Sequence, residues 1–335
     1  MKHYRAPRWL PGGHLQTIWS ALAATAQTSK VPKFQRQRWN TPDGDFIDVD
    51  FLQHEDCEPQ APTPQSVRPM LVLFHGLEGS SSSHYAQAFA SWALQQGVDL
   101  AIPHFRGCSG ELNLAPRAYH SGDHAEIDWI LKRLASQQHV TTPLLAAGVS
   151  LGGNALMRWA GEHGVAAGRT VRAVASICSP LDLAASGRAI GRGFNRQVYT
   201  RMFLRSMKPK AMAKWRQYPG LFDAQRLHAA TDLYAFDNVF TAPLHGFVDT
   251  QDYWAQASAL PHLPHIQIPA LALNACNDPF IPASSLPRPD QVSRHVTLWQ
   301  PAHGGHVGFP VGAPPAHLAA MPQAVGGWLL EQLNG

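Results

Sequence analysis

One serine in this chain stands in a pattern that suits a nucleophile. The pentapeptide Gly148-Val149-Ser150-Leu151-Gly152 has the spacing G-x-S-x-G, in which the serine occupies a strained turn between a strand and a helix. The residues two before and two after the serine must be small, because backbone segments approach each other closely there. A helix that opens at Leu151 would direct its N-terminus at the serine and favour developing negative charge. We therefore expect Ser150 to act as the nucleophile of a serine hydrolase.

A serine nucleophile needs a base, and the base needs an orienting acid. Hydrolases built around this turn carry both later in the chain, the acid before the histidine. Asp278 follows an apolar, strand-like run, and His306 lies in a glycine-rich loop after the last strand-like run. Asn277 cannot ionise, which removes the neighbouring rival for the acid, although an aspartate before proline is also a common turn residue. His303 is the alternative base.

Two backbone amides are the expected donors to the oxyanion that forms when the serine attacks a carbonyl group. One belongs to Leu151, the residue after the nucleophile, and the other to Leu77 in the loop after an early strand. The pair His303 and His306 also raises the question of a metal site. No third ligand with suitable spacing accompanies them, so we expect neither a metal nor a cofactor.

The elements that would position these residues alternate along the chain. Short apolar runs are typical of strands that are buried on both faces, and they occupy residues 70–74, 98–105, 144–149, 171–178, 270–273 and 295–299. Helical patterns occupy residues 85–96, 124–138, 151–163 and 322–333. Residues 46–52 alternate apolar with acidic side chains, which predicts a half-buried antiparallel strand. The alternation predicts an α/β fold with a mostly parallel central sheet flanked by helices.

One long insertion interrupts this alternation. Residues 180–265 contain several helix-like stretches, many aromatic residues and no clear buried strand. We therefore expect the first part of an α/β core in residues 1–179, with an N-terminal arm over residues 1–35. An inserted helical cap is expected in residues 180–265, and the second part of the core in residues 266–335.

Composition places the chain among globular proteins. It has 335 residues, of which 45% are apolar and 15% charged, enough to bury a sizeable core. No stretch has the length and apolarity of a membrane span, and no apolar segment of a secretory signal follows the basic N-terminus. The cysteines, widely spaced at positions 57, 108, 178 and 276, are expected to be reduced and buried. These features predict a cytoplasmic location.

Positive charge is concentrated in the predicted cap. Between Arg188 and Arg216 there are nine basic residues and no acidic one. Arg188, Arg192 and Arg196 recur every four residues, which predicts that they share one helical face. This face is either simply solvated, or it makes peripheral contact with an anionic membrane, such as the inner membrane. We expect no nucleic-acid binding, because no reader module is recognisable.

Segments along the whole chain resemble the YheT-like branch of the α/β-hydrolase superfamily. Besides the serine turn, they are residues 7–10, 14–17, 75–80, 105–111, 119–122, 236–237, 241–243 and 304–309. The resemblance implies a Ser150–Asp278–His306 triad that cleaves small-molecule or lipid carboxylic esters. Because some relatives transfer the acyl group to an alcohol, an acyltransferase is an alternative, and a non-catalytic binding protein on the same fold is another. The family often has two aspartates where this chain has Asn277-Asp278.

Overall fold

An eight-stranded sheet forms the centre of the computed structural model, which describes residues 1, 3–24, 31–54, 68–137 and 142–334. The strand order is β1-β2-β4-β3-β5-β6-β7-β8. Strands β3 to β8 run parallel, whereas β2 is antiparallel to both β1 and β4. The bounds are β1 Phe34–Asn40, β2 Phe46–Leu52, β3 Met70–Phe74, β4 Asp99–Pro103, β5 Leu144–Val149, β6 Ala173–Ile177, β7 Ala270–Leu273 and β8 Val296–Trp299. The predicted mostly parallel α/β architecture is confirmed.

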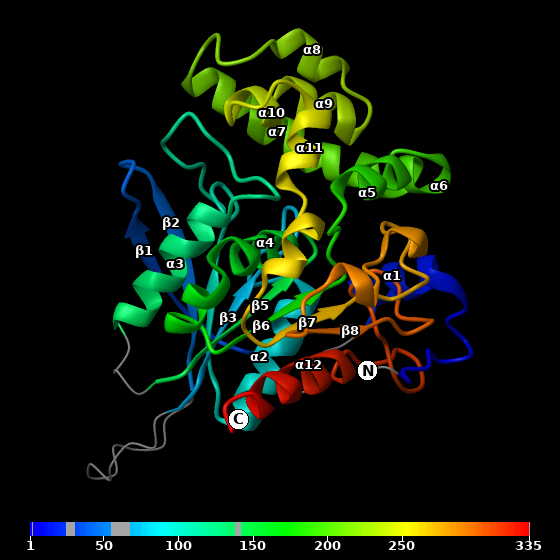
Figure 1. The fold of residues 1–335 in the computed structure, drawn as a ribbon. Helices are drawn as coiled ribbons and strands as arrows, with labels where there is room; N and C mark the ends of the chain where they lie inside the picture. Colours follow the sequence, from blue (N-terminus) through cyan, green and yellow to red (C-terminus); the bar gives the residue numbers. More distant parts are fainter. Residues whose placement is uncertain (2, 25–30, 55–67, 138–141, 335) are drawn as a thin grey trace.

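Helices cover both faces of the sheet (Figure 1). On one face lie α2 (His84–Gln96) and α12 (Ala320–Glu331), and on the other α3 (His124–Gln137) and α4 (Leu151–His163). Successive side chains of a strand point to opposite faces, so Leu71 and Leu73 of β3 pack with α2 and α12. Val72 and Phe74 pack with α3 and α4. Strand β3 is thus buried on both faces, which explains its uninterrupted apolar sequence.

The N-terminal arm contains a helix that the sequence pattern did not predict. Helix α1 (Gly12–Leu22) buries the polar residues Gln16, Thr17 and Ser20, whereas Leu15 and Leu22 are 47% and 81% exposed. Its polarity is therefore inverted relative to an ordinary amphipathic helix. Strand β1 was also missed, because its sequence is mostly polar and exposed.

Strand β2 is antiparallel as predicted, but the expectation that it is half-buried is wrong. All but one of its residues are buried. The acidic side chains of Asp48 and Asp50 are covered by the neighbouring strand β1, where Arg38 and Arg36 pair with them at N–O distances of 2.9 and 2.7 Å. The alternation of apolar and acidic residues therefore reflects buried carboxylates that pair with partly exposed arginines, instead of a solvated face.

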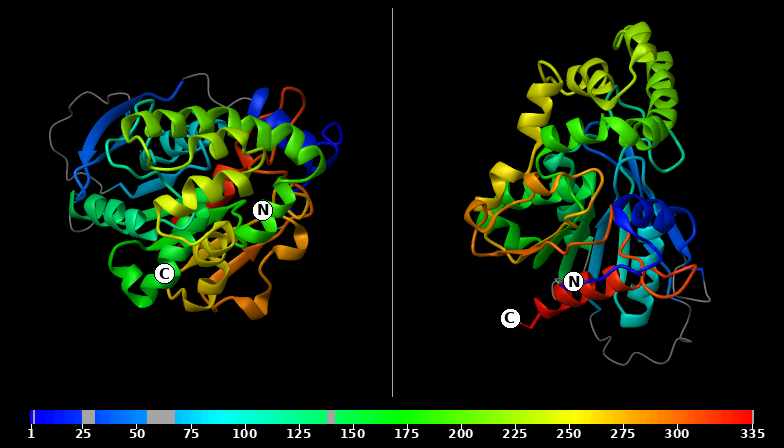
Figure 2. Two further views of the ribbon diagram at one scale, coloured as in Figure 1. Left: turned by 90° about the horizontal axis from the view of Figure 1, so that it is seen from above. Right: turned by 90° about the vertical axis from the view of Figure 1, so that its right-hand side faces the viewer.

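The chain between Leu183 and His265 is helical in every element that the structure describes there, and we call it the helical segment. Apart from its last turn, Leu260–His265, which packs against α4, it lies above the carboxyl ends of the parallel strands, at the end of the molecule opposite the termini (Figures 1 and 2). It has an apolar cluster of its own around Leu204, Phe236 and Phe240. Its elements are α5 Leu183–Ile190, α6 Gly193–Asn195, a π-helical turn Arg196–Thr200, α7 Arg201–Gln217, α8 Ala224–Ala229, α9 Leu233–Val239, α10 Thr241–Leu244, α11 Thr250–Ala257 and a 3₁₀ turn Leu260–His265. The boundaries of the predicted cap, at residues 180 and 265, stay a prediction.

Two sequence expectations about surface residues are wrong. Arg188 and Arg192 do not share one helical face with Arg196, because α5 ends at Ile190 and Arg192 has an extended backbone.

Cys178 is buried as expected, but Cys276 is exposed. Cys57 lies outside the described residues. No helix in the part of the chain that the structure describes has both the length and the apolarity to cross a bilayer.

A buried arginine ties the segment before β2 to helix α3. The Arg106 guanidinium contacts Asp45 at 2.7 Å and Glu126 at 2.6 Å, and all three side chains are buried. Replacing Arg106 by Met would remove the nearest cation from both carboxylates. We expect Arg106→Met to lower the free energy of unfolding by about 3–5 kcal/mol, measured by urea denaturation. The exposed Arg169, replaced by Met, should change it by less than about 0.5 kcal/mol; equal effects of the two substitutions would contradict this role.

Candidate active site

Ser150 occupies a strained turn between β5 and α4. Its backbone angles, φ 52° and ψ −118°, lie in a region that non-glycine residues rarely adopt. A Cβ at Gly148 would lie 2.5 Å from the Gly152 carbonyl oxygen, and a Cβ at Gly152 would lie 2.5 Å from the His75 carbonyl oxygen. The two glycines thus permit the close approach that presents the serine side chain at the carboxyl end of β5.

Three side chains from distant parts of the chain form a continuous hydrogen-bonded series. His306 Nε2 lies 3.1 Å from Ser150 Oγ, and His306 Nδ1 lies 2.8 Å from Asp278 Oδ2. Asp278 Oδ1 accepts a hydrogen bond of 2.8 Å from the Phe280 amide, and the Asp278 side chain is fully buried. With the proton on Nδ1 shared with Asp278, the other ring nitrogen is free to accept the proton of Ser150.

The structure distinguishes between the two candidate histidines. His306 makes the contact with Ser150, and its ring packs against Phe280 with a centroid separation of 4.2 Å. His303 is exposed. The glycine-rich loop after β8 thus carries one histidine into the site and one at the surface.

The loop after β3 leaves one amide available between two that are occupied. The Gly76 amide donates to Tyr85 Oη at 2.9 Å, and the Glu78 amide donates to Tyr119 Oη at 2.9 Å. Among the described residues, neither the Leu77 amide nor the Leu151 amide at the start of α4 has a hydrogen-bond partner. Leu77, Leu151 and Ser150 all line one cavity. The two residues predicted to supply oxyanion donors therefore both have an amide without a partner and both line the cavity at Ser150.

A neutral histidine holds this loop against the next strand connection. The pKa of the fully buried His75 is lowered to about 3 by burial. Its Nε2 therefore accepts the Phe105 amide hydrogen at 3.0 Å, and its Nδ1 donates to the Gly76 carbonyl oxygen at 2.7 Å. His75 thereby acts through hydrogen bonds that fix the backbone on one side of the cavity.

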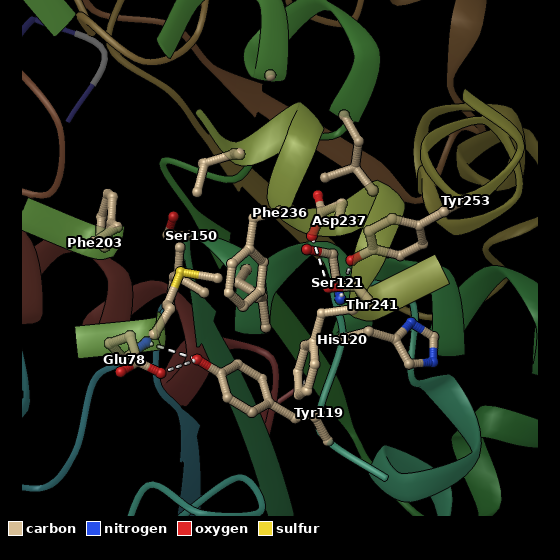
Figure 3. Close-up of a pocket in the computed structure, with 18 of the residues that line it drawn as sticks. Glu78, Tyr119, His120, Ser121, Ser150, Phe203, Phe236, Asp237, Thr241 and Tyr253 are labelled. Atoms are coloured by element: carbon tan, nitrogen blue, oxygen red, sulfur yellow. Dashed lines mark hydrogen bonds between the residues drawn. The ribbon is translucent and has the colours of Figure 1, made fainter. Parts of the chain in front are cut away.

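The cavity above Ser150 has mainly apolar walls. Core residues and the helical segment both contribute to it, including Leu183, Ile190, Phe203, Phe236 and Ile281. Figure 3 shows polar groups on two sides of the Phe236 ring: Glu78 with Tyr119 on one, and Asp237 with Thr241 and Tyr253 on the other.

Both acidic side chains in the cavity wall, Glu78 and Asp237, have partners within the protein. Glu78 contacts Lys210 of helix α7 at 2.9 Å, which links the helical segment to the loop after β3. Asp237 accepts hydrogen bonds from Thr241 and Trp254 at 2.7 and 3.0 Å, and burial raises its pKa to about 6.

Helix α1 contributes two positioning residues that the chemical pattern did not reveal. Thr17 Oγ1 accepts the amide hydrogen of His306 at 2.8 Å. Gln16 Oε1 accepts from the Gly304 amide at 2.9 Å and from Asn277 Nδ2 at 3.0 Å. The only sequence signals for them were the resemblance over residues 14–17 and their polarity within an apolar stretch.

Asn277 is more than a residue that cannot ionise. Its Oδ1 accepts the Gly305 amide hydrogen at 3.0 Å, while its Nδ2 donates to Gln16. The side-chain amide therefore joins the loop that carries Asp278 to the loop that carries His306, with helix α1 as the third partner. A carboxylate here could not donate to Gln16.

The fold and the turn at Ser150 define an α/β-hydrolase, the class of protein in which a serine occupies such a strand–turn–helix junction. Residues 69–313 match the family model described as "alpha/beta hydrolase fold". The chain is 36% identical over 298 residues to the protein YheT of Escherichia coli (strain K12), an esterase by its provisional name, covering 88% of this chain and 84% of that one. It is 26% identical to the phospholipase ABHD3 of Homo sapiens, covering 84% of this chain and 68% of that one. The chain belongs to the α/β-hydrolase family, in its YheT-like group of esterase- and lipase-type hydrolases.

Solved structures agree on the fold. An esterase from Pyrococcus furiosus superposes with a TM-score of 0.56 at 13% identity, covering 90% of this chain and 92% of that one. The esterase Est1E of Butyrivibrio proteoclasticus, solved with ferulic acid bound, gives a TM-score of 0.54 at 15% identity, covering 89% of this chain and all of that one (100%). At such identities, the likeness shows the fold alone.

The contacts of Gln16 lead to a prediction about stability. Gln16 is 1% exposed, and replacing it by Met would remove the acceptor for the Gly304 amide and for Asn277. Since an unpaired buried donor costs about 1–3 kcal/mol, we expect Gln16→Met to lower the free energy of unfolding by about 2–4 kcal/mol. Urea denaturation measures this, with the exposed Gln225→Met as the matched control. A Gln16→Met protein as stable as that control would show that these hydrogen bonds of Gln16 do not stabilise the fold.

Proposed function

We propose that this protein hydrolyses carboxylic esters through an acyl-enzyme formed on Ser150. The observation that carries the proposal is the series Ser150–His306–Asp278, with contacts of 3.1 and 2.8 Å, beside an apolar cavity. Membership of the esterase- and lipase-type group supports it, since YheT carries the name of an esterase and ABHD3 that of a phospholipase.

The first half of the reaction attaches the acyl group to the enzyme. His306 Nε2 takes the proton of Ser150 Oγ as that oxygen attacks the ester carbonyl carbon. Asp278, buried and bonded to His306 Nδ1, stabilises the imidazolium that results. The amides of Leu77 and Leu151 donate to the oxyanion. The imidazolium then gives its proton to the departing alcohol, and the bond from the carbonyl carbon to the alcohol oxygen breaks.

The second half releases the acid. A water molecule takes the place of the alcohol and loses a proton to His306 as it attacks the acyl carbon. The same two amides stabilise the second oxyanion. Protonation of Ser150 Oγ by His306 then frees the carboxylic acid and restores the enzyme.

The walls of the cavity indicate which part of the ester it holds. Leucine, isoleucine and phenylalanine side chains dominate the lining, and such surfaces favour hydrocarbon over polar groups. The acyl chain of a small-molecule or lipid ester therefore fits this space. The polar pairs at Glu78 and Asp237 are part of the same walls, where they would meet polar groups of the ester.

Activity against p-nitrophenyl esters of graded acyl-chain length tests the nucleophile. Ser150→Ala should lower kcat/KM by at least about 10⁴-fold, because the remaining groups lack a nucleophile to act on. Ser186 lines the same cavity, and its hydroxyl has no hydrogen-bond partner in the described residues. Ser186→Ala is therefore the matched control and should stay within several-fold of the wild type. Wild-type rates in Ser150→Ala would refute the assignment.

The contact between Thr17 and the His306 amide gives a second test. Thr17→Val has nearly the same shape but removes the acceptor, so the loop that carries His306 loses an anchor. We expect kcat to fall roughly tenfold or more with KM little changed, since small displacements of a base are costly. Thr17→Ser keeps the hydroxyl and should restore most of kcat. If both variants behave alike, the hydroxyl does not position His306.

A further inference from the structure

The outer side of the helical segment contains a hollow lined by cations. Arg196, Arg201, Arg205 and Lys208 line it together with Thr231, and no acidic residue takes part in the lining. Lys208 Nζ donates to the His228 carbonyl oxygen at 2.7 Å, and Arg196 donates to Thr231 Oγ1 at 2.9 Å. Both acceptors are neutral, so they leave the charges uncompensated. Among the described residues, none of the four cations forms an ion pair.

A local change of helix type brings these four cations to one side. Residues Arg196–Thr200 form a π-helical turn, which is wider than an α-helical turn. Arg196, at its start, lines the same hollow as Arg201, the first residue of α7. In the α-helix that follows, Arg201, Arg205 and Lys208 have spacings of four and three, which place them on one face.

Two other basic residues of helix α7, Lys210 and Lys214, bind groups of the core and differ in this from the cations of the hollow. Lys214 is 2% exposed and donates to the carbonyl oxygens of Asn113 and Ala115 at 2.6 and 2.9 Å. Lys210 is paired with Glu78. These two lysines hold helix α7 on the core, whereas the residues of the hollow face outward.

The neighbouring face of α7 lines a groove that leads towards Ser150. Met202, Ser206 and Pro209 line this groove, each one position after a cation of the hollow. The groove shares Leu77, Phe203 and Lys210 with the cavity above Ser150. Met202 is 56% exposed at the outer end of this wall. A cationic surface thus adjoins an exposed apolar side chain at the approach to the site.

We propose that this hollow binds the phosphate groups of an anionic phospholipid bilayer and thereby sets the groove against the membrane. The inference rests on the proposed ester hydrolysis, to which it adds the route of the substrate. Cations attract the anionic headgroups, and Met202 enters the interfacial layer. The exposed Met202 beside the cations favours a bilayer over a soluble phosphate compound, since a soluble anion would not use this side chain. An ester embedded in the bilayer then reaches Ser150 along the groove.

Co-sedimentation of the full chain with vesicles tests the docking. The probes are vesicles of phosphatidylcholine alone and vesicles that also contain about 30% phosphatidylglycerol, whose charge supplies the attraction. We expect binding to the anionic vesicles only, weakened in about 0.5 M salt because salt screens exposed charges. Arg201→Gln/Arg205→Gln should bind roughly thirtyfold more weakly, as each cation near the surface contributes about 1 kcal/mol.

A matched double variant separates the hollow from total charge. Arg188 and Arg216 are exposed and lie outside the hollow, so Arg188→Gln/Arg216→Gln removes the same charge and should retain most of the binding. Met202→Ser should weaken binding to vesicles while leaving all four cations in place. Equal losses in both double variants, binding unchanged in Arg201→Gln/Arg205→Gln, or equal binding to both kinds of vesicle would overturn the proposal. So would binding that Met202→Ser leaves unchanged and millimolar inorganic phosphate abolishes, since that marks a soluble-anion site.

The docking and the chemistry are measured separately. Ser150→Ala should bind anionic vesicles like the wild type, because Ser150 does not line the hollow. Arg201→Gln/Arg205→Gln should cleave soluble p-nitrophenyl esters at the wild-type rate but lose rate on an ester carried in anionic vesicles. A wild-type protein that binds vesicles without cleaving any ester would refute the hydrolase function alone.

Discussion

The close approach of the first turn of α4 to the end of β3 is the constraint on which this site depends. A Cβ at Gly152 would meet the carbonyl oxygens of Phe74 and His75, and a Cβ at Gly76 would lie 3.3 Å from the Cβ of Ser150. Only with glycine at such positions do the Leu77 and Leu151 amides come to line the same cavity as the serine hydroxyl. The strained backbone of Ser150 costs about 1–3 kcal/mol, which the buried strands on either side offset through their packing.

The second requirement is that the loops after β7 and β8 keep a fixed separation. The loop after β8 is costly in itself, because Val307 and Phe309 have positive φ values of 56° and 48° without being glycine. Helix α1 supplies what the loop lacks. Gln16 and Thr17 satisfy backbone amides on either side of Gly305, and Asn277 joins the network from the loop that carries Asp278. The distance from Asp278 to His306 is thus set from outside the series Ser150–His306–Asp278, by a helix from the opposite end of the chain.

Local sequence signals predicted the parts of this arrangement that local physics determines. The strand, turn and helix around Ser150 are contiguous, and their apolar run, glycines and helical periodicity are readable together. The sequence also favoured His306 over His303, but the packing against α1 and Phe280 that places His306 beside Ser150 could not be read from it. Helix α1 escaped prediction for a related reason. It buries its polar side chains on other loops and exposes Leu15 and Leu22, so its hydrophobic pattern points the wrong way. Arg188 and Arg192 show the opposite error, a regular spacing that a helix break makes meaningless.

Helix α7 shows how one element serves several surfaces at once. Leu204 and Ala211 pack into the apolar cluster of the helical segment, while Phe203 and Lys210 line the cavity above Ser150. Because the helix has 3.6 residues per turn, the residues between these two sets must face the groove and the solvent. Met202, Ser206 and Pro209 line the groove, and the cations of the hollow face the solvent. A shift of α7 along its axis would therefore move the cavity wall, the Lys210–Glu78 contact and the cationic hollow together. Since Glu78 adjoins the Leu77 amide, the position of this helix bears directly on the geometry at which an oxyanion would be held.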